Sequence, residues 1–112
     1  MTGRLVLVES PYAGDVPTNV AYARAALRDC LERGEYPFAS HLLYPGVLDD
    51  DDPAARELGL EAGLAWGKRA DVTAVYTDLG ISSGMRTGIS HAVEHHRPIE
   101  YRRIEGWACP VR

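Results

Sequence analysis

The sequence predicts an α/β fold with a parallel sheet, and two observations lead to this prediction. Short β-rich runs alternate with helical patterns of a dozen or more residues along the chain. Proline, glycine and capping residues stand between these runs, where turns and helix ends are expected. The chain also contains no internal repeat. Strands that alternate with helices in this way favour a parallel sheet joined by right-handed crossovers.

The first half of the chain predicts two strands around one helix. The run RLVLVES at 4–10 is apolar and rich in β-formers, so we expect a buried strand. A helical pattern follows at 19–34, and Thr18 or Asn19 is expected to cap it. The segment YPFAS at 36–40 is a short strand candidate, and the residues after it are expected to be irregular.

The second half predicts two more strands and two helices. Asp52 and Pro53 open the helix PAARELGLEAGLAWGKRA as its N-cap and first residue. The strand DVTAVYT follows, and then the loop and helix that begin with GISSGMR. The last run, PIEYRRI at 98–104, is more amphipathic, so it is expected at an edge of the sheet.

The totals define the broad class of protein. The 112 residues fit one domain, which we place at 1–104, with a C-terminal tail at 105–112. A net charge of -4 argues against a nucleic acid polymer as partner. No apolar run reaches the ~18 residues of a membrane span, and the N-terminal run is too short for a signal peptide.

The cysteines and histidines suggest neither disulfides nor a metal. Cys30 and Cys109 lie far apart, which favours reduced thiols and a cytoplasmic protein. No pair of cysteines or histidines has the spacing of a zinc site. We therefore expect no metal and no cofactor.

A candidate phosphate site lies at the start of the helix near residue 84. Ligands of parallel sheets bind beyond the carboxyl ends of the strands, which directs attention to loops 10–18, 40–52 and 78–84. In the last loop, Ser82, Ser83 and Gly84 stand where free N–H groups favour an anion. From residue types alone the alternative is an ordinary cap, in which Ser83 satisfies its own helix.

Five more residues are candidates for the site. Ser10 and Gly14 could face a phosphate, and Tyr12 could stack on a base or sugar; the alternative is a turn with a surface tyrosine. His41 follows a strand end, where it could act as acid or base near neutral pH or be structural. Arg86 opposes the dipole of its helix, so it is expected to pair with a phosphate or with a nearby acid.

Taken together, VESPYAG, PFASHLLYP, ADVTAVYTDLGISSGMRTGISHA and RPIEY resemble the nucleoside 2-deoxyribosyltransferase-like superfamily. This superfamily includes the 2'-deoxynucleoside 5'-phosphate N-hydrolases and a small uncharacterised branch from phages and actinobacteria, to which the likeness is closest. The resemblance implies a flavodoxin- or Rossmann-like three-layer sandwich with a mainly parallel sheet of four to five strands. It also implies a homodimer that cleaves or exchanges the N-glycosidic bond of a nucleoside or nucleoside 5'-monophosphate.

The resemblance further implies which residues act. In active relatives a Glu in a pattern like G-x-x-x-E-x-x-x-A attacks the anomeric carbon, and Ser and Gly of the same loop hold the 5'-phosphate. The phosphate residues correspond to Ser82 and Gly84, whereas the Glu position falls on Gly88. The supporting Asp of relatives falls near Gly63. The phosphate-binding part is therefore expected to be kept and the catalytic pair to be lost.

Two other carboxylates lie at strand ends and could replace the lost pair. Asp78 ends the third strand and Glu9 ends the first, and either could act as a base on water. We expect Asp78 to be the better candidate, because its loop carries the phosphate turn. Two alternatives stay open: a catalytically inactive nucleotide-binding or sensing protein, and a protein that kept only the fold.

Overall fold

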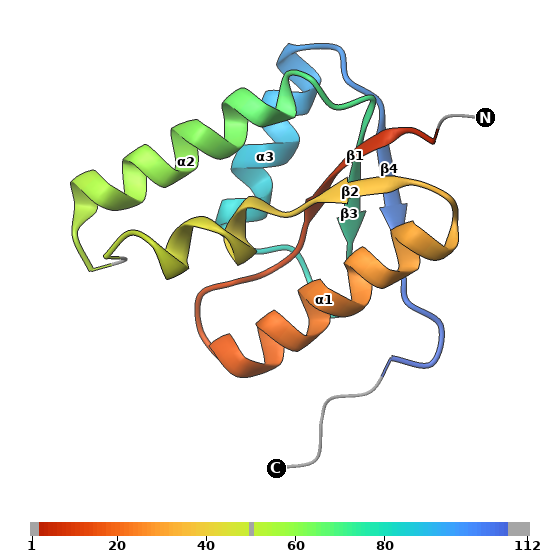
Figure 1. Ribbon diagram of the computed structural model, residues 1–112, viewed down its shortest axis with the longest axis horizontal. Coiled ribbons are helices and arrows are strands. Elements are labelled where there is room, and N and C mark those ends of the chain that lie inside the picture. The colour runs from red at the N-terminus through yellow and green to blue at the C-terminus, as the bar shows by residue number, and fades with distance from the viewer. Residues whose placement is uncertain (1–2, 50, 108–112) are drawn as a thin grey trace.

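A four-stranded parallel sheet forms the centre of the computed structural model, which describes residues 3–49 and 51–107 (Figure 1). The strand order is β2-β1-β3-β4, and every pair of neighbours is parallel. The strands are β1 (Leu5–Glu9), β2 (Tyr36–Phe38), β3 (Val72–Tyr76) and β4 (Ile99–Arg102). The predicted α/β fold with a parallel sheet is confirmed, and β4 lies at an edge as expected.

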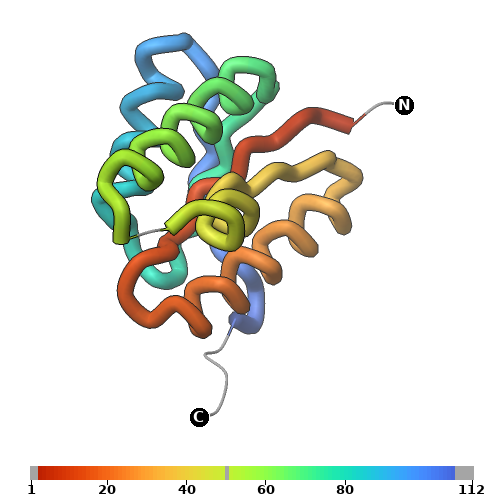
Figure 2. The backbone as a smooth tube through the Cα atoms, turned by 60° about the vertical axis from the view of Figure 1, so that its left-hand side comes forward, coloured from red at the N-terminus to blue at the C-terminus, as the bar shows by residue number. Residues whose placement is uncertain are grey.

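Helices cover both faces of this sheet. Helix α1 (Val16–Glu32) lies on one face, and α2 (Pro53–Gly67) and α3 (Ser83–Glu94) lie on the other (Figures 1 and 2). The strand order explains this arrangement. The chain leaves β1 toward β2 and later crosses back to β3 and β4, and the right-handed connections usual in parallel sheets place the helices of these two directions on opposite faces. The result is a three-layer sandwich.

Alternate strand residues pack on opposite faces. Val6 and Val8 belong to the core that α1 covers, while Leu7 points to the other face and lies against α2. Its Cδ2 atom is 2.9 Å from where a Cβ at Gly67 would lie, so this glycine allows α2 to approach the sheet closely. All of β3 is buried, as expected for a central strand of a sheet covered on both sides.

The start of α1 differs from the prediction. The helix begins at Val16 and its N-cap is Asp15, so the prediction that Thr18 or Asn19 caps it is wrong. Asp15 accepts hydrogen bonds from the backbone N–H of Thr18 at 3.3 Å and from its hydroxyl at 2.9 Å. Pro17 does not prevent this start, because a first-turn residue needs no N–H partner. Asn19 instead donates to two carbonyl groups of the preceding loop.

The other connections agree with the sequence more closely. Asp52 caps α2 by accepting from the N–H of Ala54 at 3.0 Å, as predicted. The irregular segment before it forms two short 3-10 turns, η1 (Ser40–Leu42) and η2 (Tyr44–Gly46). Cys30 is a free, buried thiol, and Cys109 lies outside the described residues. No helix among the described residues is both long enough and apolar enough to cross a membrane.

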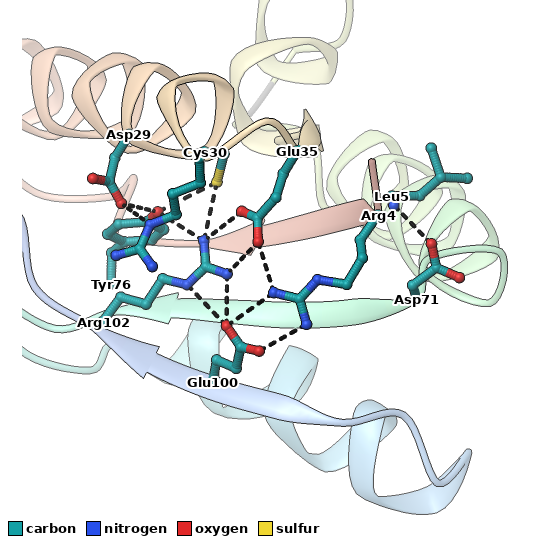
Figure 3. A network of polar contacts seen from close by, with 10 residues as sticks. Arg4, Leu5, Asp29, Cys30, Glu35, Asp71, Tyr76, Glu100 and Arg102 are labelled. Atoms are coloured by element: carbon teal, nitrogen blue, oxygen red, sulfur yellow. Dashed lines mark hydrogen bonds and ion pairs between the residues drawn. The ribbon is translucent and has the colours of Figure 1, made fainter. Parts of the chain in front are cut away.

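Two arginines and two glutamates form a closed ring of ion pairs on the α1 side of the sheet (Figure 3). Arg102 donates to both oxygens of Glu35 at 2.8 Å and to Glu100 at 2.6 Å. Arg4 completes the ring, at 2.7 Å from Glu35 and 2.8 Å from Glu100. These bonds lower the pKa of both carboxyl groups. We call this set (Arg4, Glu35, Glu100 and Arg102) the arginine–glutamate ring.

Candidate functional site

A cavity opens at the carboxyl ends of β1 and β3, where the chain leaves the two strands in opposite directions. Parallel sheets bind their ligands at such a switch point. We call this the inner cavity; its volume is ≈ 260 Å³. It shares lining residues with an outer cavity of ≈ 590 Å³ that extends over η2 and the start of α2. The residues lining both are Tyr12, Ser40, His41, Arg56, Leu60, Ser83 and Gly84.

The start of α3 faces both cavities. Ser82 is the N-cap, and its hydroxyl accepts from the N–H of Met85 at 3.3 Å. Ser83 and Gly84 are the first helical residues, whose N–H groups have no acceptor within the helix. Both residues are exposed and line the two cavities. The helix therefore has its ordinary cap in Ser82 and still presents free donors and the positive end of its dipole to the cavity.

Gly88 lies one turn further along α3 and is buried against Glu9. A Cβ atom built at Gly88 has three nearest neighbours, and all belong to the Glu9 carboxyl group: Oε2, Cδ and, at 2.9 Å, Oε1. Both residues line the inner cavity. The carboxyl group at the end of β1 therefore fills the space that a side chain at position 88 would occupy.

The Glu9 carboxyl has no hydrogen bond or ion pair with any of the described residues, although the residue is half-buried. Burial raises its pKa to about 8, and the positive charge of Arg97 opposes this rise. Arg97 is itself buried and donates from Nε to the Thr73 hydroxyl at 2.7 Å. Near neutral pH the Glu9 carboxyl is therefore mostly protonated, which suits a general acid.

Ser10 and His41 form a pair beside Glu9. The Ser10 hydroxyl lies 2.7 Å from His41 Nε2, and both residues line the inner cavity. Burial lowers the pKa of His41 to about 4, so the imidazole is neutral near pH 7. A neutral imidazole can donate or accept one hydrogen bond to a ligand but carries no charge to offer it.

The remaining candidates of the first loop and of α3 divide between the cavity and the surface. Tyr12 lines both cavities. Gly14 is not among the lining residues; its φ of +102° forms the turn before α1. Arg86 is exposed and lines neither cavity.

Arg56 is a cation that the sequence analysis missed. It lies near the start of α2, lines both cavities and forms no side-chain ion pair with any described residue. The signal that singled out Arg86, a cation near a helix start, applied equally to Arg56.

Asp78 is held away from both cavities by three hydrogen bonds. Its Oδ2 accepts from the Tyr22 hydroxyl at 2.6 Å and from the N–H of Ile104 at 2.9 Å. Its own N–H donates to the Tyr22 oxygen at 2.8 Å. Asp78 therefore joins α1 to the segment after β4, and it is not among the residues that line either cavity.

Gly63 lies on the α2 side of the inner cavity, where the resemblance placed a supporting Asp. The Ser40 hydroxyl lies 2.7 Å from where a Cβ at Gly63 would lie, so Ser40 fills this space. Glu61 is exposed. Within 3–49 and 51–107, no group of three or more His, Cys, Asp or Glu side chains is arranged to hold a metal ion.

The sheet and its switch-point cavity define a small flavodoxin-like α/β protein. The chain belongs to a family described as a domain of unknown function (DUF7768), which matches residues 4–102. No curated protein matches it. Among solved structures it is similar to a 2-deoxyribosyltransferase from the psychrotolerant bacterium Bacillus psychrosaccharolyticus, with a TM-score of 0.64 and 17% identity. That similarity covers 95% of this chain and 77% of the other, and it shows a shared fold.

Proposed function

We propose that this protein hydrolyses the N-glycosidic bond of a nucleoside 5'-monophosphate and that Glu9 is its catalytic carboxyl. One observation carries the proposal: the unpartnered Glu9 carboxyl faces the cavity that also receives the start of α3. The fold shared with a 2-deoxyribosyltransferase supports a nucleoside as the substrate. The catalytic position thus moves from α3, where Gly88 has no side chain, to the end of β1.

The spacing along α3 supports the placement of the substrate. The free N–H groups of Ser83 and Gly84 bind the 5'-phosphate, as other helix starts bind anions. Gly88, against which the Glu9 carboxyl packs, lies four residues after Gly84, which is ~6 Å along a helix axis. A nucleotide spans a comparable length between its phosphate and its anomeric carbon. The base then extends toward the outer cavity, where Tyr44 and Leu48 offer apolar surface.

The proposed hydrolysis uses the Glu9 carboxyl twice, first as an acid and then as a base. Protonated Glu9 donates its proton to the nitrogen of the leaving base as the bond to the anomeric carbon breaks. The resulting carboxylate faces the positively charged sugar and accepts a proton from the water that adds to it. The products are a free base and a sugar 5-phosphate, and Glu9 ends protonated as it began. The neutral His41 and Ser10 are placed to orient the sugar or the water by hydrogen bonds.

Asp78 is the competing carboxylate, and a direct comparison tests the assignment. The protein is incubated with a panel of nucleoside 5'-monophosphates, modified pyrimidines included, and mass spectrometry records free base and retained ligand. We expect free base from the unmodified protein, about 100-fold less from Glu9→Gln, and release within a few-fold of normal from Asp78→Asn. Loss of activity in Asp78→Asn with normal release in Glu9→Gln would show the opposite assignment.

The same panel separates hydrolysis from its alternatives. A retained nucleotide without free base would mark a binding or sensing protein. A new nucleotide formed after addition of a second free base would mark deoxyribosyl transfer. If neither a product nor a retained ligand is detected, the protein shares only its fold with the transferase.

The proposal includes a homodimer in the cytoplasm. The free thiol of Cys30 supports a reducing compartment. Exposed apolar side chains on α2, among them Leu58 and Trp66 at 56% and 58% exposure, support a contact surface on this helix. Analytical ultracentrifugation of the full chain tests the dimer, and a monomer at all accessible concentrations would exclude it.

A further inference from the structure

Gly88 leaves free the space beside the inner cavity in which the Glu9 carboxyl lies. We propose that positions 9 and 88 are two alternative attachment points for one catalytic carboxyl, and that Gly88 is a positioning residue for Glu9. The inference rests on the proposed function and extends it, because it predicts which changes keep the activity and which abolish it.

The contact between the two residues supports this inference. The three atoms nearest to a Cβ at Gly88 are all at the far end of the Glu9 side chain, and none belongs to the backbone. An added side chain at position 88 therefore displaces the carboxyl and leaves the strand in place. A glutamate at position 88 would in turn enter the volume that Glu9 occupies, provided that residue 9 is small.

The lack of other partners makes the position of the carboxyl depend on Gly88. Among the described residues, none donates a hydrogen bond to Glu9 or pairs with it. The charge of Arg97 attracts the carboxylate without contacting it. Packing against α3 is thus the main restraint on the Glu9 side chain. A methyl group at position 88 would occupy the space of the carboxyl group and displace it.

Four variants and one control test the inference on the full chain. The variants are Gly88→Ala, Gly88→Glu, Glu9→Ala and the double variant Glu9→Ala/Gly88→Glu. The control is Ser90→Ala, an exposed change on the same helix outside both cavities. Circular dichroism confirms that each variant is folded, and base release is measured as kcat and KM between pH 5 and pH 9.

We expect Gly88→Ala to lower kcat at least 30-fold with little change in KM and to move the limb of the pH profile that reports Glu9 toward lower pH. Glu9→Ala should lose about 100-fold, and the double variant should regain at least ten-fold over Glu9→Ala. Ser90→Ala should match the unmodified protein. Unchanged kcat and pH profile in Gly88→Ala, or a folded double variant no more active than Glu9→Ala, would overturn the inference.

A second measurement works even without turnover. If the unmodified protein releases no base, the proposed function has failed, and the positional claim is then tested by carbon NMR titration of the Glu9 carboxyl. We expect its pKa of about 8 to fall toward its ordinary 4.5 in Gly88→Ala as the group moves into water. The same titration midpoint in both proteins would show that Gly88 does not position Glu9.

Discussion

The half-buried Glu9 carboxyl should make the protein less stable as pH rises, and Glu9→Gln should remove this dependence. The folded pKa of about 8 lies above the ordinary 4.5, so the folded state binds the proton more tightly. Stability is therefore fully present below pH 4.5 and is lost as pH rises toward 8. The interval is about 3.5 pH units at 1.4 kcal/mol each, so the loss is several kcal/mol and at most about 5.

Urea unfolding at pH 5, 7 and 9 measures this loss. Glutamine resembles the protonated acid in shape and carries no charge at any of these pH values. We expect the difference in unfolding free energy between Glu9→Gln and the unmodified protein to grow in favour of the variant from pH 5 to pH 9. Parallel pH dependence in the two proteins would refute the reasoning, because Glu9 would then titrate alike in the folded and unfolded states.

Three further predictions follow from the site and the ring. Arg56 lines both cavities, so we expect it to pair with the 5'-phosphate. Arg56→Gln should therefore raise KM for a nucleoside 5'-monophosphate at least ten-fold and leave KM for the nucleoside unchanged, whereas Arg86→Gln should change neither KM. Equal effects of the two variants would show that Arg56 does not pair with the phosphate. Arg102→Met should lower the unfolding free energy by about 3 kcal/mol at pH 7, because a buried carboxylate loses its bidentate partner. The exposed pair of Arg28 provides the control, and Arg28→Met should cost less than about 1 kcal/mol in the same urea titration. The pKa of His41 falls from 6.5 to about 4 on folding, so about 3 kcal/mol of stability is lost as pH falls through this interval. His41→Gln should abolish this loss, which thermal unfolding between pH 4 and pH 7 measures.

Local signals were enough to predict the fold. Alternation of strands and helices predicted the parallel sheet, and Asp52 with Pro53 marked the start of α2 because capping depends on neighbouring residues alone. The start of α1 was harder to predict, since Asp15, Thr18 and Asn19 are all good caps. The hydrogen bonds that occupy the Asn19 side chain, to two carbonyl groups of the preceding loop, are not visible in the sequence.

Which of Glu9 and Asp78 lies at the inner cavity depends on the face of the sheet to which each side chain points. Glu9 alternates with Val8 and so shares the face of Leu7, which α2 and α3 cover. Asp78 shares the face of Tyr76, which α1 covers. The two-residue period was present in the sequence. This alternation could assign Glu9 to a face of the sheet only once the strand order had placed α3 on that face.

The arginine–glutamate ring has a consequence for the kinetics of unfolding. It joins Arg4, just before the first strand, to Arg102, at the end of the last. Contacts between such distant parts of the chain are slow to form, so we expect the ring to close after the folding barrier, once β4 has docked. Interactions formed after the folding barrier slow unfolding and leave the folding rate almost unchanged. The ring should therefore keep the first and last strands from detaching separately, and it should lengthen the lifetime of the folded state more than it shortens folding.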